Sequence, residues 1–108
     1  MSLPELIQYF RNGGTYDGFC KLHRIDSDED VTEIYMQKPY GLNNKLEFFK
    51  VDETAGKKQY SYNGSDFYYL FDFYYFLSAV KEADRPQSAS ITDIDLALRL
   101  LDNAEKDF

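Results

Sequence analysis

The stretch DFYYLFDFYYF, Asp66 to Phe76, decides how the second half of this chain folds. Eight of its eleven residues carry aromatic rings, and one carboxylate, Asp72, lies inside the run. The apolar run around it, residues 67–80, also contains Ser78 and is shorter than the about 20 residues that a membrane-spanning helix needs. We therefore expect a folded domain without a membrane segment.

The stretch fits two local structures. Aromatic residues favour strands, so Asn63-Gly64 in front of it can form a hairpin turn that leads into a strand. Alternatively, Ser65 or Asp66 caps a helix that runs to about residue 84. We expect the helix from at least Asp72 onward, because LSAVKEAD, residues 77–84, has high helical propensity.

A helical stretch would have an apolar side and an opposite side that carries Tyr68, Asp72 and Tyr75. Tyrosine combines a large ring with a polar tip, which is typical of protein-binding surfaces. These three residues are then either covered by the N-terminal helix or by a second copy of the chain, or they are anchors for a partner. If the stretch is a strand, alternate residues share a face and this division fails.

Strand-like runs precede the aromatic stretch. VTEIYMQ (31–37) and KLEFFKV (45–51) are rich in β-branched and aromatic residues and are separated by the turn-forming segment KPYGLNN. They predict two paired antiparallel strands. After a turn at residues 56–58, QYSY (59–62) alternates like a third strand.

Helical patterns lie at both ends of the chain. Ser2 and Glu5 form a capping-box signature, Asn12-Gly13-Gly14 ends that first helix, and residues 15–24 favour a second short one. Near the C-terminus, Thr92 is a good N-cap for a helix with one apolar face, formed by Ile94, Ala97, Leu98, Leu101, Ala104 and Phe108. The sequence thus predicts a single α+β domain over residues 1–108, with a small antiparallel sheet of about three strands packed with N-terminal and C-terminal helices.

The chain is acidic, with a formal net charge of −7 over 108 residues. Binding to phosphates needs Lys and Arg, so this charge argues against direct binding of nucleic acid. The acidity either steers the chain toward basic partners or only keeps it soluble. Because Cys20 is the single cysteine and the first residues lack a secretory pattern, we expect a cytoplasmic protein.

Residues that carry metal or catalytic chemistry are sparse. Cys20 and His23 have the spacing of half a zinc site, but the chain has no further Cys or His to complete it. The acidic segment at residues 26–30 imitates the start of a calcium loop, yet Val31 stands where the loop needs Gly and Gln37 where it needs Glu. We therefore expect no enzyme activity, no metal and no cofactor.

Three segments of the chain are distinctive together, namely SLPELIQYFRNGG (2–14), DSDEDVTEIYMQKP (26–39) and YYLFDFYYFLSAV (68–80). With these segments the chain resembles small bacterial immunity proteins, particularly those of contact-dependent growth inhibition systems. The resemblance implies a stoichiometric inhibitor that binds a cognate toxin domain, often a nuclease, and protects the producing cell.

The charge agrees with such a partner, because nuclease sites are basic and carboxylates can take the positions of phosphates. We assign the electrostatic part of the expected surface to Asp26, Asp28, Glu29, Asp30 and Glu33. We assign the packed part to Tyr68, Asp72 and Tyr75. The alternative is an adaptor or regulatory subunit, including a phage-type inhibitor that mimics nucleic acid, and both alternatives are compatible with a homodimer.

Overall fold

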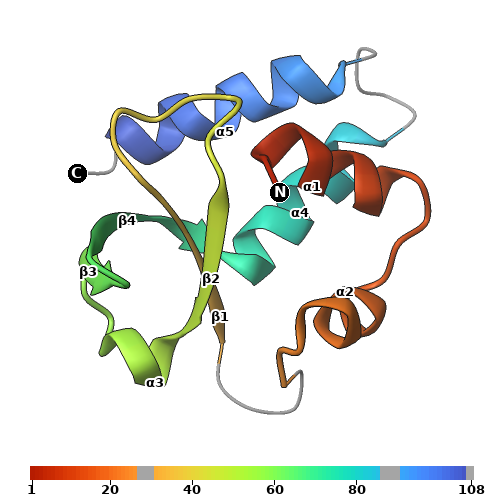
Figure 1. The fold of residues 1–108 in the computed structure, drawn as a ribbon. Helices are drawn as coiled ribbons and strands as arrows, with labels where there is room; N and C mark the ends of the chain where they lie inside the picture. Colours follow the sequence, from red (N-terminus) through yellow and green to blue (C-terminus); the bar gives the residue numbers. More distant parts are fainter. Residues whose placement is uncertain (27–30, 86–90, 107–108) are drawn as a thin grey trace.

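Four antiparallel strands form one sheet, with helices packed over it (Figure 1). The computed structural model describes residues 1–26, 31–85 and 91–106. Within these residues the strand order is β2-β1-β4-β3, and the strands are β1 (Thr32–Met36), β2 (Leu46–Lys50), β3 (Gln59–Tyr62) and β4 (Ser65–Asp72). The helices are α1 (Leu3–Arg11), α2 (Tyr16–His23), α3 (Val51–Thr54), α4 (Phe73–Ala83) and α5 (Asp93–Lys106).

The predicted α+β fold is confirmed, with four strands in place of about three. The extra strand comes from the aromatic stretch, which is a strand up to Asp72 and a helix from Phe73 onward. Asn63 and Gly64 have φ angles of 52° and 80°, which suit the two-residue turn that joins β3 to β4. The expected helix from Asp72 onward is confirmed as well, because Asp72 is its N-cap and accepts a hydrogen bond from the Tyr75 backbone N–H at 2.8 Å.

The strand corrects the helical division of the stretch. Tyr69 pairs with Tyr35 across the sheet, Phe71 pairs with Ile34, and the register shift between these pairs leaves Leu70 as the extra residue of a bulge. Leu70 and Phe71 are therefore both buried in the main core. The set of Tyr68, Asp72 and Tyr75 does not form one helical face.

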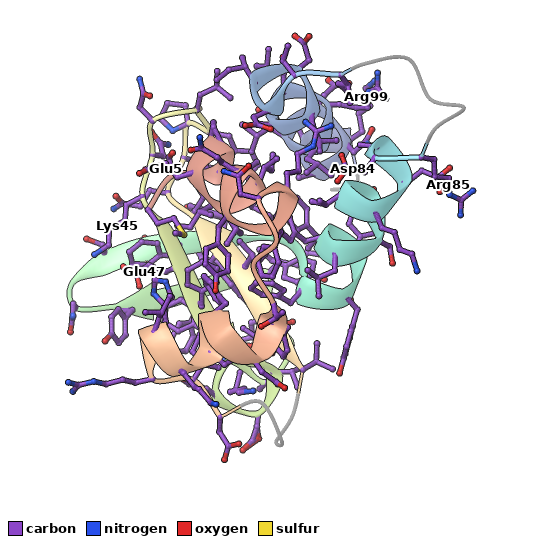
Figure 2. The ribbon with its side chains drawn as sticks, turned by 90° about the vertical axis from the view of Figure 1, so that its right-hand side faces the viewer. Glu5, Lys45, Glu47, Asp84, Arg85 and Arg99 are labelled. Carbon is purple, nitrogen blue, oxygen red and sulfur yellow. The ribbon has the colours of Figure 1, made fainter. Side chains whose placement is uncertain are left out.

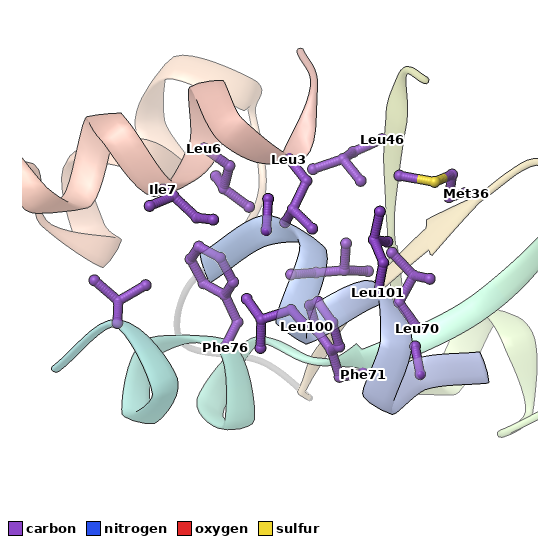
Figure 3. Packing of buried hydrophobic residues seen from close by; sticks show 14 of the residues in the cluster. Leu3, Leu6, Ile7, Met36, Leu46, Leu70, Phe71, Phe76, Leu100 and Leu101 are labelled. Atoms are coloured by element: carbon purple, nitrogen blue, oxygen red, sulfur yellow. The ribbon is translucent and has the colours of Figure 1, made fainter. Parts of the chain in front are cut away.

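The main core lies between the sheet and α1, α4 and α5. Figure 3 shows Leu3, Leu6 and Ile7 of α1 near Phe76 of α4 and Leu100 and Leu101 of α5. Helix α1 packs against both of the other two helices. A second, smaller cluster of Tyr35, Phe49 and Phe67 lies on the other face of the sheet, because successive strand residues point to opposite faces.

The buried face of α5 differs from the one expected. Ile94 and Leu98 are 46% and 50% exposed, although the pattern placed them on the apolar face. The residues that α5 buries are Leu96, Ala97, Leu100, Leu101 and Ala104. Because α5 packs on both α1 and β4, the side that it buries includes Leu96 and Leu100 in place of Ile94 and Leu98. Phe108 lies outside the described residues.

The guanidinium of Arg11 joins the ends of three helices. Its Nε contacts Asp84 Oδ1 at 2.8 Å, just beyond α4. Its Nη1 donates to the Ile91 carbonyl at 2.8 Å and to Asp93 Oδ1 at 3.0 Å, at the start of α5. The Arg11 side chain is only 16% exposed, so these charge-assisted bonds are partly shielded from water.

Replacing Arg11 by Met keeps an unbranched apolar stem and removes the guanidinium with all three bonds. We expect Arg11→Met to lower the free energy of unfolding by about 2 kcal/mol, because hydrogen bonds to charged groups contribute that much when partly buried. Urea denaturation followed by circular dichroism measures this loss.

Lys106→Met is the matched control. It breaks the ion pair of Lys106 Nζ with Asp102 Oδ2, which is also short at 2.9 Å but lies on the exposed side of α5. Exposed pairs contribute about 0–1 kcal/mol. Equal losses in the two variants would contradict the role assigned to Arg11.

Candidate functional site

A cleft with a volume of about 660 Å³ lies between α4 and α5. This volume is within the range of about 300–1,000 Å³ that is typical of binding sites in proteins. On one side the cleft is lined by Tyr75, Ala79, Glu82 and Ala83 of α4. On the other side it is lined by Ile91, Asp95, Leu96, Arg99, Leu100 and Asn103.

Small side chains explain why the two helices leave this space. Ala79 and Ala83 lie one turn apart on α4 and present only methyl groups to the cleft. Leu96 and Leu100, one turn apart on α5, are buried and line the opposite wall. Residues four apart occupy the same face of a helix, so each pair forms a short apolar ridge on its wall, beside the polar residues of the lining.

A smaller cavity of about 130 Å³ extends the cleft toward the start of α4. It is lined by residues 69–72 of β4 and by Ala104, and it shares Tyr75 and Asn103 with the larger cavity. We call the two cavities together the α4–α5 cleft. Tyr75 stands between them, 46% exposed, with its ring centroid 5.7 Å from that of Phe71.

The charged groups of the α4–α5 cleft are mostly acidic. Asp72 lies at one end, and Glu82 and Asp95 lie toward the other end, where Glu82 pairs with Arg85 at 3.3 Å. The cleft has one guanidinium in its lining, that of Arg99 on α5 (Figure 2). Within the described residues the lining thus contains three carboxylates and one cation.

Tyr69 borders the smaller cavity. Burial, and after it the nearby carboxylates of Asp72 and Glu33, which disfavour a phenolate, raise the pKa of Tyr69 to about 12. Its hydroxyl therefore stays protonated at neutral pH.

Of the three predicted anchors, Tyr68, Asp72 and Tyr75, only the last two line the cleft. Asp72 and Tyr75 lie together in the α4–α5 cleft. Tyr68 belongs to β4 and is half-buried, with the Lys38 ammonium 4.6 Å from the centroid of its ring. Tyr68 is not among the residues that line the cleft with the other two.

Glu33 is buried, in contrast to the exposed carboxylate that we expected from the sequence. It lies on the central strand β1 and is 7% exposed. Its Oε1 accepts a hydrogen bond from Thr54 Oγ1 of α3 at 2.6 Å, and the Tyr35 hydroxyl lies 3.4 Å away. Glu33 therefore holds the short helix α3 over the second face of the sheet through this hydrogen bond. The sequence analysis did not predict α3.

The remaining acidic residues belong to another part of the molecule. Asp26 is exposed and follows α2, a helix that lies at the opposite end of the fold from α5 (Figure 1). The Lys50 ammonium donates a hydrogen bond to the carbonyl of Asp26. Asp28, Glu29 and Asp30 lie outside the described residues.

Metal-binding groups are not gathered in the described part of the chain. No group of three or more His, Cys, Asp or Glu side chains there has an arrangement that holds an ion. Cys20 is buried, and the ring of His23 packs on Phe19 with 4.2 Å between centroids. Among the same residues, no helix has the length and apolar character to cross a membrane.

The α5 side of the cleft was missed by the sequence analysis. Asp95, Arg99 and Asn103 line the cleft, and the sequence analysis assigns none of them to a binding surface. The available signal was the pair of alanines one turn apart, Ala79 and Ala83, because small residues at this spacing leave a groove when a second helix lies alongside. The sequence does not say which helix that is.

Comparison of the chain with protein family models, with curated proteins and with solved structures gives no match. A functional assignment therefore depends on the residues of the chain itself.

The position of Tyr69 predicts a loss of stability at alkaline pH. An unfolded tyrosine titrates near pH 10, whereas the pKa of folded Tyr69 is about 12. Between these values the unfolded state releases a proton that the native state keeps, so stability falls as pH rises through this window. Tyr69→Phe should make the fall in the urea midpoint between pH 10 and 12 shallower. An equal change in Tyr74→Phe, whose ring is exposed, would contradict this assignment.

The hydrogen bond from Thr54 to Glu33 predicts that removing the Thr54 hydroxyl lowers the free energy of unfolding. Thr54→Val keeps the shape of the side chain but leaves the buried carboxylate without its donor at 2.6 Å, which should cost about 2 kcal/mol of unfolding free energy. Ser61→Ala is the control, because it removes a bond of the same length from Ser61 to Asp66 on the exposed surface. Chemical denaturation distinguishes the two, and similar losses would show that burial of Glu33 has no energetic consequence.

Proposed function

We propose that this chain is an immunity protein that binds a cognate toxin domain, most simply a nuclease, and neutralises it as a stoichiometric inhibitor. The observation that carries the proposal is the α4–α5 cleft, an acidic groove with the half-exposed ring of Tyr75 at its centre. This cleft is the part of the described surface to which we assign the contact with the toxin.

Tyr75 has the properties of an interface hot spot. Its ring offers a large apolar area beside the cleft, and its backbone is fixed by the hydrogen bond to Asp72. A tyrosine that loses water in a preformed groove typically contributes about 2 kcal/mol to binding. Little ordering entropy is lost on binding, because α4 holds the residue in place before the partner arrives.

The distribution of charge supports a basic partner. The described residues contain 15 acidic and 12 basic side chains, whereas the remaining residues contain four acidic ones, Asp28, Glu29, Asp30 and Asp107, and no basic ones. More than half of the net charge of −7 therefore belongs to those four positions. Long-range attraction acts on the whole domain, so it can speed the encounter without these residues lying in the final contact.

The direct test uses the product of the reading frame next to the gene of this chain, which under this proposal encodes the toxin domain. Titration calorimetry with that domain should give a 1:1 complex, and the toxin's activity should disappear at equimolar chain. The association rate should fall about tenfold or more as salt rises from low to high concentration, because steering is screened. Absence of a complex in both calorimetry and gel filtration would overturn the proposal.

Two neighbouring tyrosines allow the contact surface to be located. Tyr75→Ala should weaken binding to the toxin domain about thirtyfold, which corresponds to the about 2 kcal/mol of a hot-spot ring. Tyr74→Ala is the matched control, because Tyr74 is 64% exposed on the same helix turn but does not line the cleft. Calorimetry on both variants measures the difference, and equal weakening would place the contact elsewhere.

A further inference from the structure

The α4–α5 cleft also indicates which part of a partner enters it. We propose that the occupant is one cationic amphipathic helix of the partner protein. This inference rests on the proposed function, namely that a basic protein partner binds at the cleft.

The walls of the cleft favour a helix over a strand. The two facing walls of the larger cavity are formed mainly by α4 and α5, and the backbone N–H and C=O groups inside a helix are already bonded within it. A strand added to a protein binds through free backbone groups at a sheet edge, which these two helical walls do not offer. A helix instead inserts side chains three and four residues apart into a groove.

The apolar residues of the cleft repeat at the spacing that a helix presents. Ala79 and Ala83 on α4, and Leu96 and Leu100 on α5, are each four residues apart. A third helix lying along the cleft would place its own apolar residues at positions i and i+4 between these ridges. The methyl groups of the alanines leave room for larger aliphatic side chains such as leucine.

The charges of the cleft predict where the incoming helix carries basic residues. Asp72 lies at one end and Asp95 at the other, where Glu82 also lines the cleft but is paired with Arg85 at 3.3 Å. Lys or Arg at the two ends of the incoming helix would complement them. Arg99 lies between the ends and disfavours a basic residue at the middle of that helix, since like charges brought together are repelled.

A small molecule fits this arrangement less well. Sites for small ligands bring a few polar groups to one point in a largely apolar pocket. Here the polar groups are distributed along two helices, from Asp72 and Asn103 at one end to Glu82 and Asp95 at the other. The cleft therefore matches an elongated occupant.

A designed peptide tests the proposal without the natural partner. The probe is a labelled helix of about 14 residues, with leucines at i and i+4 in the middle and lysines at both ends. We expect saturable binding by fluorescence anisotropy and a gain of peptide helicity by circular dichroism. A peptide with Glu in place of Lys should not bind. A scrambled peptide of the same composition that binds equally well would show charge attraction alone and would overturn the proposal, as would absence of binding by the designed peptide.

Two pairs of variants place the peptide in the cleft. Ala83→Phe fills the groove and should weaken binding at least about tenfold, whereas Ser78→Phe puts the same ring on the exposed side of α4 outside the cleft. Asp95→Lys should weaken binding about tenfold, whereas Glu105→Lys makes the same charge change on α5 away from the cleft. Asp95 is exposed, so this second pair remains informative if Ala83→Phe fails to fold.

The same variants separate the two proposals. If the toxin domain binds but Ala83→Phe and Asp95→Lys bind it as tightly as their controls do, the helix proposal is wrong and the immunity function stands. If the toxin domain does not bind while the designed peptide binds in the cleft, the immunity function is wrong and the helix site stands.

Discussion

The hydrogen bond between the Asp72 carboxylate and the Tyr75 backbone N–H is the interaction on which the rest of the arrangement depends. An aromatic run has no internal signal for where a strand should end, because its rings suit both a sheet and a buried helix. Asp72 supplies that signal, since its side chain satisfies one of the free N–H groups in the first turn of α4. With the boundary at this position, the rings before it join the sheet and those after it cover the core.

The division of the rings explains why so many aromatic residues can be buried in so small a domain. Phe73 and Phe76 pack on α1 and α2, where their rings contact Phe10 and Phe19. On the other face of the sheet, Phe67 and Phe49 form the second cluster. A strand distributes its side chains to both faces of a sheet, so one continuous aromatic segment contributes rings to both clusters.

The sequence predicted the elements better than it predicted the surface. The capping box at Ser2 and the Asn63-Gly64 turn are local signals, and both are present in the structure. The burial of Glu33 depends on β1 being a central strand and on α3 folding over it, and both are tertiary facts. Likewise Tyr75 was recognised as an anchor from its own chemistry, but the α5 residues that line the cleft with it could only be identified once the helices were paired.

The bonds of Arg11 have a consequence for the spacing of the cleft walls. One guanidinium holds both the end of α4, through Asp84, and the start of α5, through Ile91 and Asp93. Arg11 itself belongs to α1 and does not line the α4–α5 cleft. Through these bonds Arg11 connects the end of α4 to the start of α5 and so limits the distance between the two walls at that end. The width of a groove on the outer surface is thereby fixed by a side chain that the occupant of the groove would never touch.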